Sequence, residues 1–144
     1  MKFTDPKKLQ IHLDKRATTI AKKNVTKVVT RATMNVERTA QESIKQKGTG
    51  RVYSRKAQPP HTASAAGNPP ATDSGFLGQN ITMNVTSKPD GSVVGQVISA
   101  SPYSKALEYG TVNMQPRPFM HPAFQKNKNK ILKMFKKQGI IKWV

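Results

Sequence analysis

The chain has 144 residues, no cysteine and a formal net charge of +18. The length favours a single domain over residues 1–144, and the absence of cysteine excludes disulfides and thiolate metal sites. No apolar run predicts a signal peptide or a membrane span, so we expect no contact with membranes. Only 35% of the residues are hydrophobic, which predicts a modest core that partner subunits help to cover.

The positive charge lies at the two ends of the chain. Residues 1–60 carry fifteen basic and four acidic side chains, residues 61–116 carry two and three, and residues 117–144 carry eight and none. This pattern favours contact with nucleic acid or with an acidic protein surface. The alternative is a solvated helix surface that keeps the protein soluble.

The N-terminal third predicts helix. Asp5 and Pro6 are typical of a helix start, and Leu9 and Leu13 would lie on one face of it. From residue 20 to residue 44 small and β-branched residues recur at helical spacing, which predicts a long helix with a thin apolar stripe. Glycines at 48 and 50 are expected to end it.

The middle of the chain predicts a long loop followed by a β-hairpin. Residues 51–60 are basic and expected to be irregular, and residues 61–77 (HTASAAGNPPATDSGFL) are rich in small residues, Gly and Pro. Pro69 and Pro70 exclude helix and central strand, so residues 51–75 predict an extended loop. Alternation from residue 76 to residue 86, a Lys-Pro-Asp-Gly turn and an apolar return strand over residues 92–100 predict an antiparallel hairpin. Gly95 predicts a bulge or a close backbone approach.

The C-terminal third predicts two helices. Residues 103–109 form a short one closed by Gly110, and residues 114–122 are expected to be extended. Pro122 is expected to open a second helix that ends at Gly139, ahead of an apolar tail at residues 140–144. The sequence therefore predicts an α+β fold in which a long N-terminal helix packs on a small antiparallel sheet, with a C-terminal helix.

Little in the sequence indicates catalysis. His61, Ser64 and Asp73 contain the residue types of a hydrolase triad, but their spacing is not diagnostic, because a scaffold assembles such triads. Retained function after Ser64→Ala would remove that interpretation. Glu108 is a lone carboxylate, which we interpret as an ion-pair partner or a helix cap. Neither clustered metal ligands nor a phosphate-binding glycine loop is present, so we expect no cofactor, no metal and no enzyme.

Three segments together resemble a known family. Residues 61–77 are similar to a His-x-x-Ser-x-x-Gly-x-x-Pro-x-x-x-x-Gly-x-Leu segment, residues 103–111 (YSKALEYGT) to a Tyr-Ala-x-x-Leu-Glu-x-Gly-Thr element, and residues 117–123 (RPFMHPA) to Arg-Pro-Phe-x-x-Pro-Ala. Their order and spacing resemble the small tail-component proteins of tailed bacteriophages. That family is the gene-ten-like family of lambdoid phages, also called tail-completion or neck proteins.

The resemblance implies a structural virion protein, assembled in the host cytoplasm, that forms a ring at the head–tail junction with sixfold symmetry. Its partners would be further copies of itself, the tail terminator, a stopper or connector ring, or the tail tube, with possible contact to the phage DNA in the channel. It implies no catalysis, and it makes residues 51–75 an intersubunit arm. The motif residues carried over as interface candidates are His61, Ser64, Gly67, Pro69, Pro70, Gly75, Leu77, Tyr103, Leu107, Glu108, Gly110, Thr111, Arg117, Pro118, Phe119 and Pro122.

A second hypothesis rests on charge alone. The basic flanks are also consistent with a nucleic-acid-binding protein that has no sequence preference. Because no helix-turn-helix, RNA-recognition or zinc-finger pattern is present, such binding would involve phosphates and weaken steeply with salt. The neutral middle of the chain and its motifs favour the structural virion protein.

Overall fold

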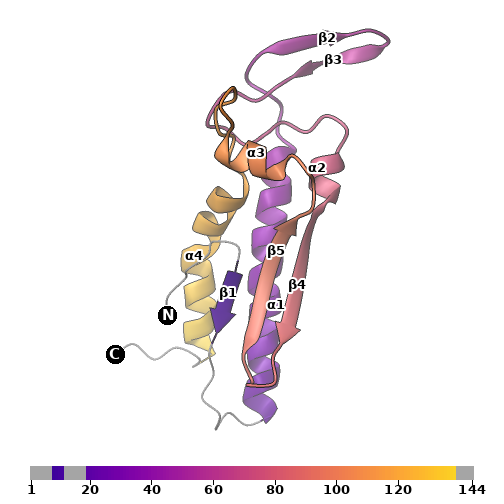
Figure 1. The fold of residues 1–144 in the computed structure, drawn as a ribbon. Helices are drawn as coiled ribbons and strands as arrows, with labels where there is room; N and C mark the ends of the chain where they lie inside the picture. The colour runs from indigo at the N-terminus through magenta and orange to yellow at the C-terminus, as the bar shows by residue number, and fades with distance from the viewer. Residues whose placement is uncertain (1–7, 12–18, 139–144) are drawn as a thin grey trace.

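The long helix α1 (Thr19–Ile44) runs along a three-stranded sheet and a second helix (Figure 1). The computed structural model describes residues 8–11 and 19–138. In the sheet, β5 (Val93–Ser99) lies between β1 (Lys8–Ile11) and β4 (Ile81–Ser87), and both pairings are antiparallel. α4 (Met120–Lys137) packs beside α1. The predicted α+β class and the long N-terminal helix are confirmed.

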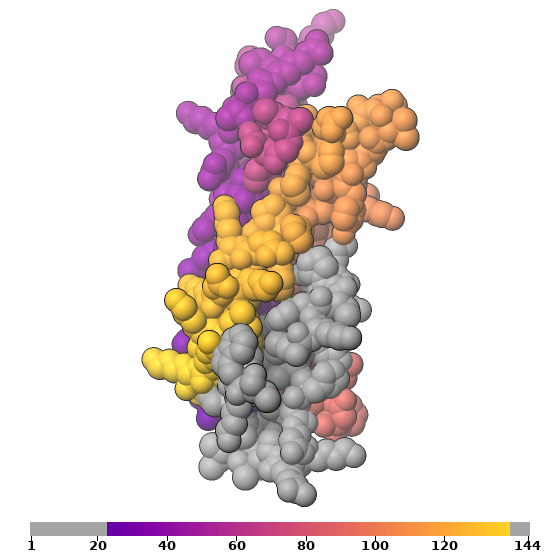
Figure 2. All heavy atoms as spheres, turned by 90° about the vertical axis from the view of Figure 1, so that its left-hand side faces the viewer, coloured from indigo at the N-terminus to yellow at the C-terminus, as the bar shows by residue number. Residues whose placement is uncertain are grey.

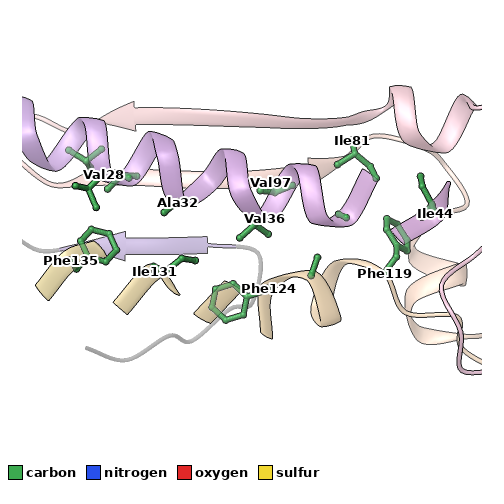
Figure 3. Packing of buried hydrophobic residues seen from close by; sticks show 14 of the residues in the cluster. Val28, Ala32, Val36, Ile44, Ile81, Val97, Phe119, Phe124, Ile131 and Phe135 are labelled. Carbon is green, nitrogen blue, oxygen red and sulfur yellow. The ribbon is translucent and has the colours of Figure 1, made fainter. Parts of the chain in front are cut away.

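The core lies where α1 meets the sheet and α4. Val28, Ala32 and Val36 of α1 lie near Phe124, Ile131 and Phe135 of α4 (Figure 3), and all six are buried. The small, β-branched residues of α1 let the other elements approach closely. An added Cβ on Gly95 in β5 would lie 2.0 Å from Thr33 Oγ1 and 3.0 Å from Val29 Cγ1. The predicted close approach at Gly95 is therefore confirmed, and the ladder with β4 continues through it without a bulge.

The predicted hairpin is present, but its first strand begins later than expected. β4 starts at Ile81, and residues Phe76–Gln79 form the short helix α2. Gly75, at a φ of 80°, starts this turn, and its N–H donates to Thr72 Oγ1 over 3.1 Å. The alternation read from residue 76 was wrong there because local turn chemistry directs the chain into a helical turn first.

The N-terminal helix predicted across Leu9 was wrong. Lys8–Ile11 is β1, which pairs with β5 in the register Lys8↔Gln96 to Ile11↔Val93. The unpaired edge of β5 offers four residues backbone partners, and this tertiary pairing overrides local helix signals. Asp5, Pro6 and Leu13 lie outside the described residues, as do Gly139 and the predicted tail.

The basic stretch after α1 is also more ordered than predicted. β2 (Val52–Arg55) and β3 (Gln58–Thr62) pair as a second hairpin, which projects beyond the end of α1 (Figure 1). Ala57 takes a positive φ of 60° at its tip. Two prolines in β3 are tolerated because each strand of a two-stranded ribbon has a free edge. α1 itself ends at Ile44, earlier than the glycines at 48 and 50.

The C-terminal helix starts two residues before Pro122, at Met120. Pro122 lies in the first turn, where its missing N–H leaves no intrahelical bond unmade. The short helix predicted over residues 103–109 is confirmed as α3 (Ser104–Tyr109). Gly110 follows it at a φ of 77°, with its N–H bonded to Ala106 O.

Candidate functional site

The three sequence segments that carry the family resemblance meet at one end of the molecule. Segment 103–111 contains α3, segment 117–123 contains the start of α4, and segment 61–77 runs from β3 past the C-terminal end of α1 into α2. We call this region the junction, defined by residues 61–77, 103–111 and 116–122. Backbone and side-chain hydrogen bonds connect each segment to another.

Glu108 joins α3 to the start of α4. Its Oε2 accepts the N–H groups of Phe119 and Met120 over 2.9 and 3.0 Å, and its Oε1 accepts that of His121 over 2.8 Å. These are donors of a first helical turn, which have no intrahelical acceptor. The carboxylate is 8% exposed and faces the positive end of the α4 dipole. The interpretation of Glu108 as a helix cap is confirmed.

Arg117 connects the third segment to the other two. Its backbone N–H donates to Leu107 O over 2.7 Å, and its Nε donates to Ser64 O over 3.1 Å. One residue earlier, Pro116 O accepts the N–H of Gly67 over 2.9 Å. The chain segment after β3 is thereby fixed to the connection between α3 and α4.

Gly110 sets the path between Glu108 and Arg117. An added Cβ there would lie 2.7 Å from Met114 O, and the left-handed backbone disfavours any side chain. Thr111 and Met114 form an isolated antiparallel bridge that closes the loop. Gly110, at a positive φ, therefore closes α3 and redirects the chain toward Arg117.

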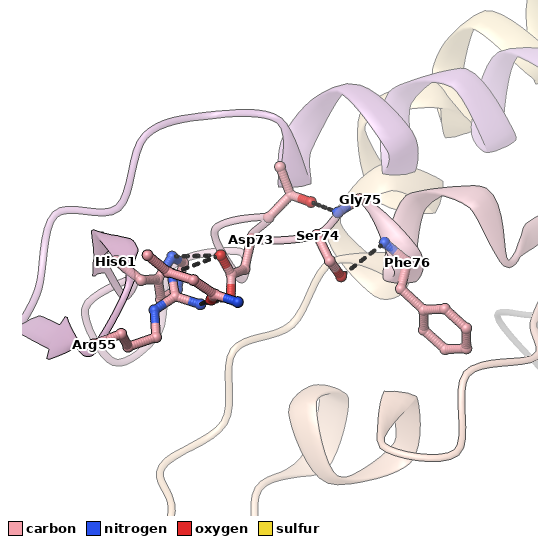
Figure 4. Close-up of polar contacts among 8 residues, drawn as sticks. Arg55, His61, Asp73, Ser74, Gly75 and Phe76 are labelled. Atoms are coloured by element: carbon pink, nitrogen blue, oxygen red, sulfur yellow. Dashed lines mark hydrogen bonds and ion pairs between the residues drawn. The ribbon is translucent and has the colours of Figure 1, made fainter.

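The projecting hairpin is connected to the junction by one charged cluster (Figure 4). Arg55 at the end of β2 donates two hydrogen bonds to the Asp73 carboxylate, over 2.6 and 2.8 Å. His61 Nδ1 lies 3.7 Å from Asp73 Oδ1. The guanidinium, through these hydrogen bonds, lowers the pKa of the Asp73 carboxyl below its usual value, and the carboxylate raises the pKa of Arg55.

His61, Ser64 and Asp73, which have the residue types of a hydrolase triad, do not form a catalytic arrangement in the described part of the chain. His61 contacts Asp73, but Ser64 Oγ is buried and has no hydrogen-bond partner, so no Ser–His hydrogen bond is present. Among the residues that the structure describes, no group of three or more acidic and histidine side chains could hold a metal. A pocket between α1, β5, α3 and α4 has a volume of about 90 Å³, well below the ~300–1,000 Å³ of small-molecule sites. A second pocket, lined by β5, α3 and the start of α4, has a volume of about 470 Å³, within that range.

The predicted site residues divide by burial. Those buried within the junction are Ser64, Pro70, Leu77, Glu108 and Phe119, and those that are half-buried are His61, Pro69, Gly75, Leu107, Gly110, Arg117, Pro118 and Pro122. Gly67, Tyr103 and Thr111 are exposed, and the Tyr103 ring lies 6.2 Å from that of Phe76, centroid to centroid. Most of the motif therefore holds the junction together, and the exposed members are the ones available to a partner.

Sequence reasoning missed two parts of this region. Residues 51–60 of the projecting hairpin carried no motif and were expected to be irregular, although they form most of two strands and expose Val52 and Tyr53 by 58% and 48%. Asn127 was also missed: its Nδ2 donates to Thr39 Oγ1 of α1 over 2.8 Å and to Ala123 O over 2.9 Å. A single amide within a lysine-rich helix gives no sequence signal that it is buried.

The chain was compared with protein-family models, curated proteins and solved structures, and none of them matches it. In the described ranges no helix has both the length and the apolar character needed to cross a membrane.

Proposed function

We propose that the chain is a structural subunit of a phage neck, a tail-completion protein that forms a ring at the head–tail junction of the virion. Within that ring it would contact further copies of itself and the tail terminator, connector or tail tube. The observation that carries the proposal is the junction, because three segments that resemble one family's motifs, far apart in sequence, are bonded to one another. If the resemblance were accidental, the three segments would have no reason to lie together in the fold.

The projecting hairpin supports an assembly role. Residues 63–75 are bonded to their own chain, through Gly50 N–H to Ala63 O, Gly67 N–H to Pro116 O and Thr72 N–H to Ile44 O. The part that extends away from the body is β2–β3, in which six of the nine residues are exposed and none is buried. An isolated two-stranded hairpin is only marginally stable in water. We therefore narrow the intersubunit arm from residues 51–75 to the hairpin at residues 51–62.

A ring requires a heterologous contact, in which two different surfaces of the same chain meet. The hairpin supplies one surface, with apolar Val52 and Tyr53 exposed on β2. A second exposed apolar surface on the same chain comprises Phe76, at the start of α2, and Tyr103, directly before α3, whose ring centroids lie 6.2 Å apart. Two such separate surfaces are what a closed ring of identical subunits needs.

The first test is the mass of the purified chain. We expect native mass spectrometry to find a closed oligomer, and Val52→Ser combined with Tyr53→Ser to convert it to monomer. The matched control is Met34→Ser on α1, because Met34 and Tyr53 are both 48% exposed. The control should keep the oligomer. A wild-type chain that stays monomeric at all concentrations would contradict self-assembly.

The second test is electron microscopy of particles assembled without this chain. We expect heads and tails that fail to join stably. If heads and tails join and the tails are complete, the proposed place at the neck is wrong.

A further inference from the structure

We propose that the outer face of the α1–α4 helix pair binds the phosphate backbone of double-stranded nucleic acid. This surface lies away from the junction and from the hairpin, and the inference does not depend on ring formation. It rests on the spacing, exposure and charge of side chains on the two helices.

Each helix carries basic residues at one repeated spacing. On α1 the positions are 27, 31, 34 and 38, occupied by Lys, Arg, Met and Arg, and on α4 they are 126, 130, 133 and 137, all Lys. Steps of four, three and four residues follow a single face of a helix. All eight side chains are exposed. We call these two rows the basic rows.

The two basic rows lie on the same side of the helix pair. α1 and α4 meet where Asn127 Nδ2 donates to Thr39 Oγ1 and lies 3.5 Å from Asn35 O. Arg31 and Arg38 are four and three residues from Asn35, and Lys130 is three residues from Asn127, so both rows border this contact. The contact has a core side and a solvent side. On each helix the row lies on the side of this contact away from the buried residues, which are Ala32 and Val36 on α1 and Ile131 and Phe135 on α4. Both rows therefore lie on the solvent side.

The face has the size and charge that a duplex requires. A row of twelve residues is about 16 Å long, and packed helices lie about 8–10 Å apart. A duplex carries one phosphate charge per ~1.7 Å of its axis, or roughly nine over that length. Ten residues of α1 between Lys23 and Gln41, among them the four of its row, line an open depression of about 1010 Å³. Figure 2 shows α4 running beside α1.

The composition of the face favours nucleic acid over a protein partner. Protein interfaces are enriched in aromatic residues and depleted in lysine, whereas the basic rows hold five lysines, two arginines and one methionine. Within the described helices, Glu37 and Glu42 are the acidic residues of α1, and α4 has none. No ion pair in the described ranges involves a basic side chain of the rows.

The absence of aromatic residues from the basic rows favours a duplex over a single strand. Single-strand binders stack bases on aromatic rings, and the exposed Phe and Tyr residues of the described chain lie on β2, on α2, and on or directly before α3. The expected recognition is through phosphates, without base specificity.

The test measures binding of the full chain to a 20-base-pair duplex by fluorescence anisotropy between 50 and 200 mM salt. One variant replaces four residues of the rows with Gln: Lys27, Arg31, Lys130 and Lys133. The matched control replaces four exposed basic residues outside the rows and the hairpin, Lys45, Lys47, Lys88 and Lys105, and so loses the same charge. The mass of each variant is measured in parallel, so that a change in assembly is distinguished from a change in binding.

We expect the four-residue row variant to bind more than tenfold more weakly at 50 mM salt. Its slope of log K against log salt should be smaller by about 3–4, because each phosphate contact contributes about 0.9 to the slope. The control should keep at least half of the wild-type slope. The proposal fails if the wild-type chain does not bind the duplex at 50 mM salt, or if both variants lose the same amount of affinity for it. It also fails if a single strand of the same length binds more tightly.

Discussion

Replacing Glu108 with Gln tests whether the junction depends on one carboxylate. The change keeps the size of the side chain but removes its charge and substitutes an NH₂ group for one of the two oxygens. An amide donor would then face a backbone N–H of α4 at a distance of about 3 Å. At least one of the three hydrogen bonds is lost, and the others lose their charge assistance.

The expected loss of stability follows from two effects. Removing a helix N-cap costs about 0.5–2 kcal/mol, and removing a partly buried negative charge from a helix N-terminus costs up to about 2 kcal/mol. Because the Glu108 carboxylate is 8% exposed, water replaces it poorly. We therefore expect Glu108→Gln to lower the free energy of unfolding by about 2–3 kcal/mol, and Glu108→Ala to lower it further, since buried unsatisfied donors cost about 1–3 kcal/mol each.

The assay is urea unfolding followed by circular dichroism, combined with amide hydrogen exchange at Phe119, Met120 and His121. The control is Glu42→Gln, an exposed carboxylate on α1, which should change the free energy of unfolding by less than about 0.5 kcal/mol. The three amides should exchange faster only in the Glu108 variants. A Glu108→Gln protein as stable as the control, with unchanged exchange at these amides, would refute the assignment of Glu108 as the cap.

Three further changes test the packing and the hairpin connection. Gly95→Ala should destabilise the fold by about 1–3 kcal/mol, and Thr33→Ala in the same chain should restore part of the loss, because Thr33 Oγ1 is the nearest atom to the added Cβ. Asn127→Ala should destabilise the fold by about 1–3 kcal/mol, since it removes a buried amide that bonds α1 to α4. Asp73→Asn should increase proteolysis at Arg55 and leave the melting temperature nearly unchanged, because the ion pair is solvent-accessible.

Each of these has a result that would contradict it. No recovery in the Thr33/Gly95 double variant would place the clash elsewhere, and an unchanged stability of the Asn127 variant would mean that water replaces its bonds.

The ion pair between Asp73 and Arg55 also has an expected pH dependence. The pKa of the Asp73 carboxyl is lowered in the folded protein. The contribution of its ion pair to stability is therefore complete above the unfolded pKa of about 3.9, and it is lost as the pH falls through the lower folded pKa. Hairpin proteolysis that rises between pH 8 and 5 would argue against this ion pair.

The sequence predicted elements whose signals are local. The small-residue periodicity of α1 and the Lys88–Gly91 turn depend on residues within a few positions, and both are in the structure. The start of α4 was placed too late because its cap, Glu108, lies eleven residues before Phe119. Residues 51–60 were expected to be irregular, yet they form most of a two-stranded ribbon, which tolerates Pro59 and Pro60 because each strand has a free edge.

Only part of the candidate site could be predicted from the sequence, because its contacts join residues that are far apart in the chain. No local pattern predicts that Arg117 bonds to Ser64, because these residues are 53 positions apart and only the fold brings them together. Glu108 and Gly110, by contrast, were selected by the family resemblance, and the structure adds a physical reason for each. The Glu108 carboxylate caps α4. Gly110 adopts a positive φ that other residues disfavour.

The bond between Asn127 and Thr39 has a consequence for how the chain folds during synthesis. These residues are 88 positions apart, so α1 leaves the ribosome long before α4 can cover its apolar side. A helix rich in valine and threonine has low intrinsic stability, and contacts this distant in sequence form slowly. α1 therefore gains its contacts with α4 only when that helix has been made, and until then its apolar stripe is exposed to chaperones and to other nascent chains.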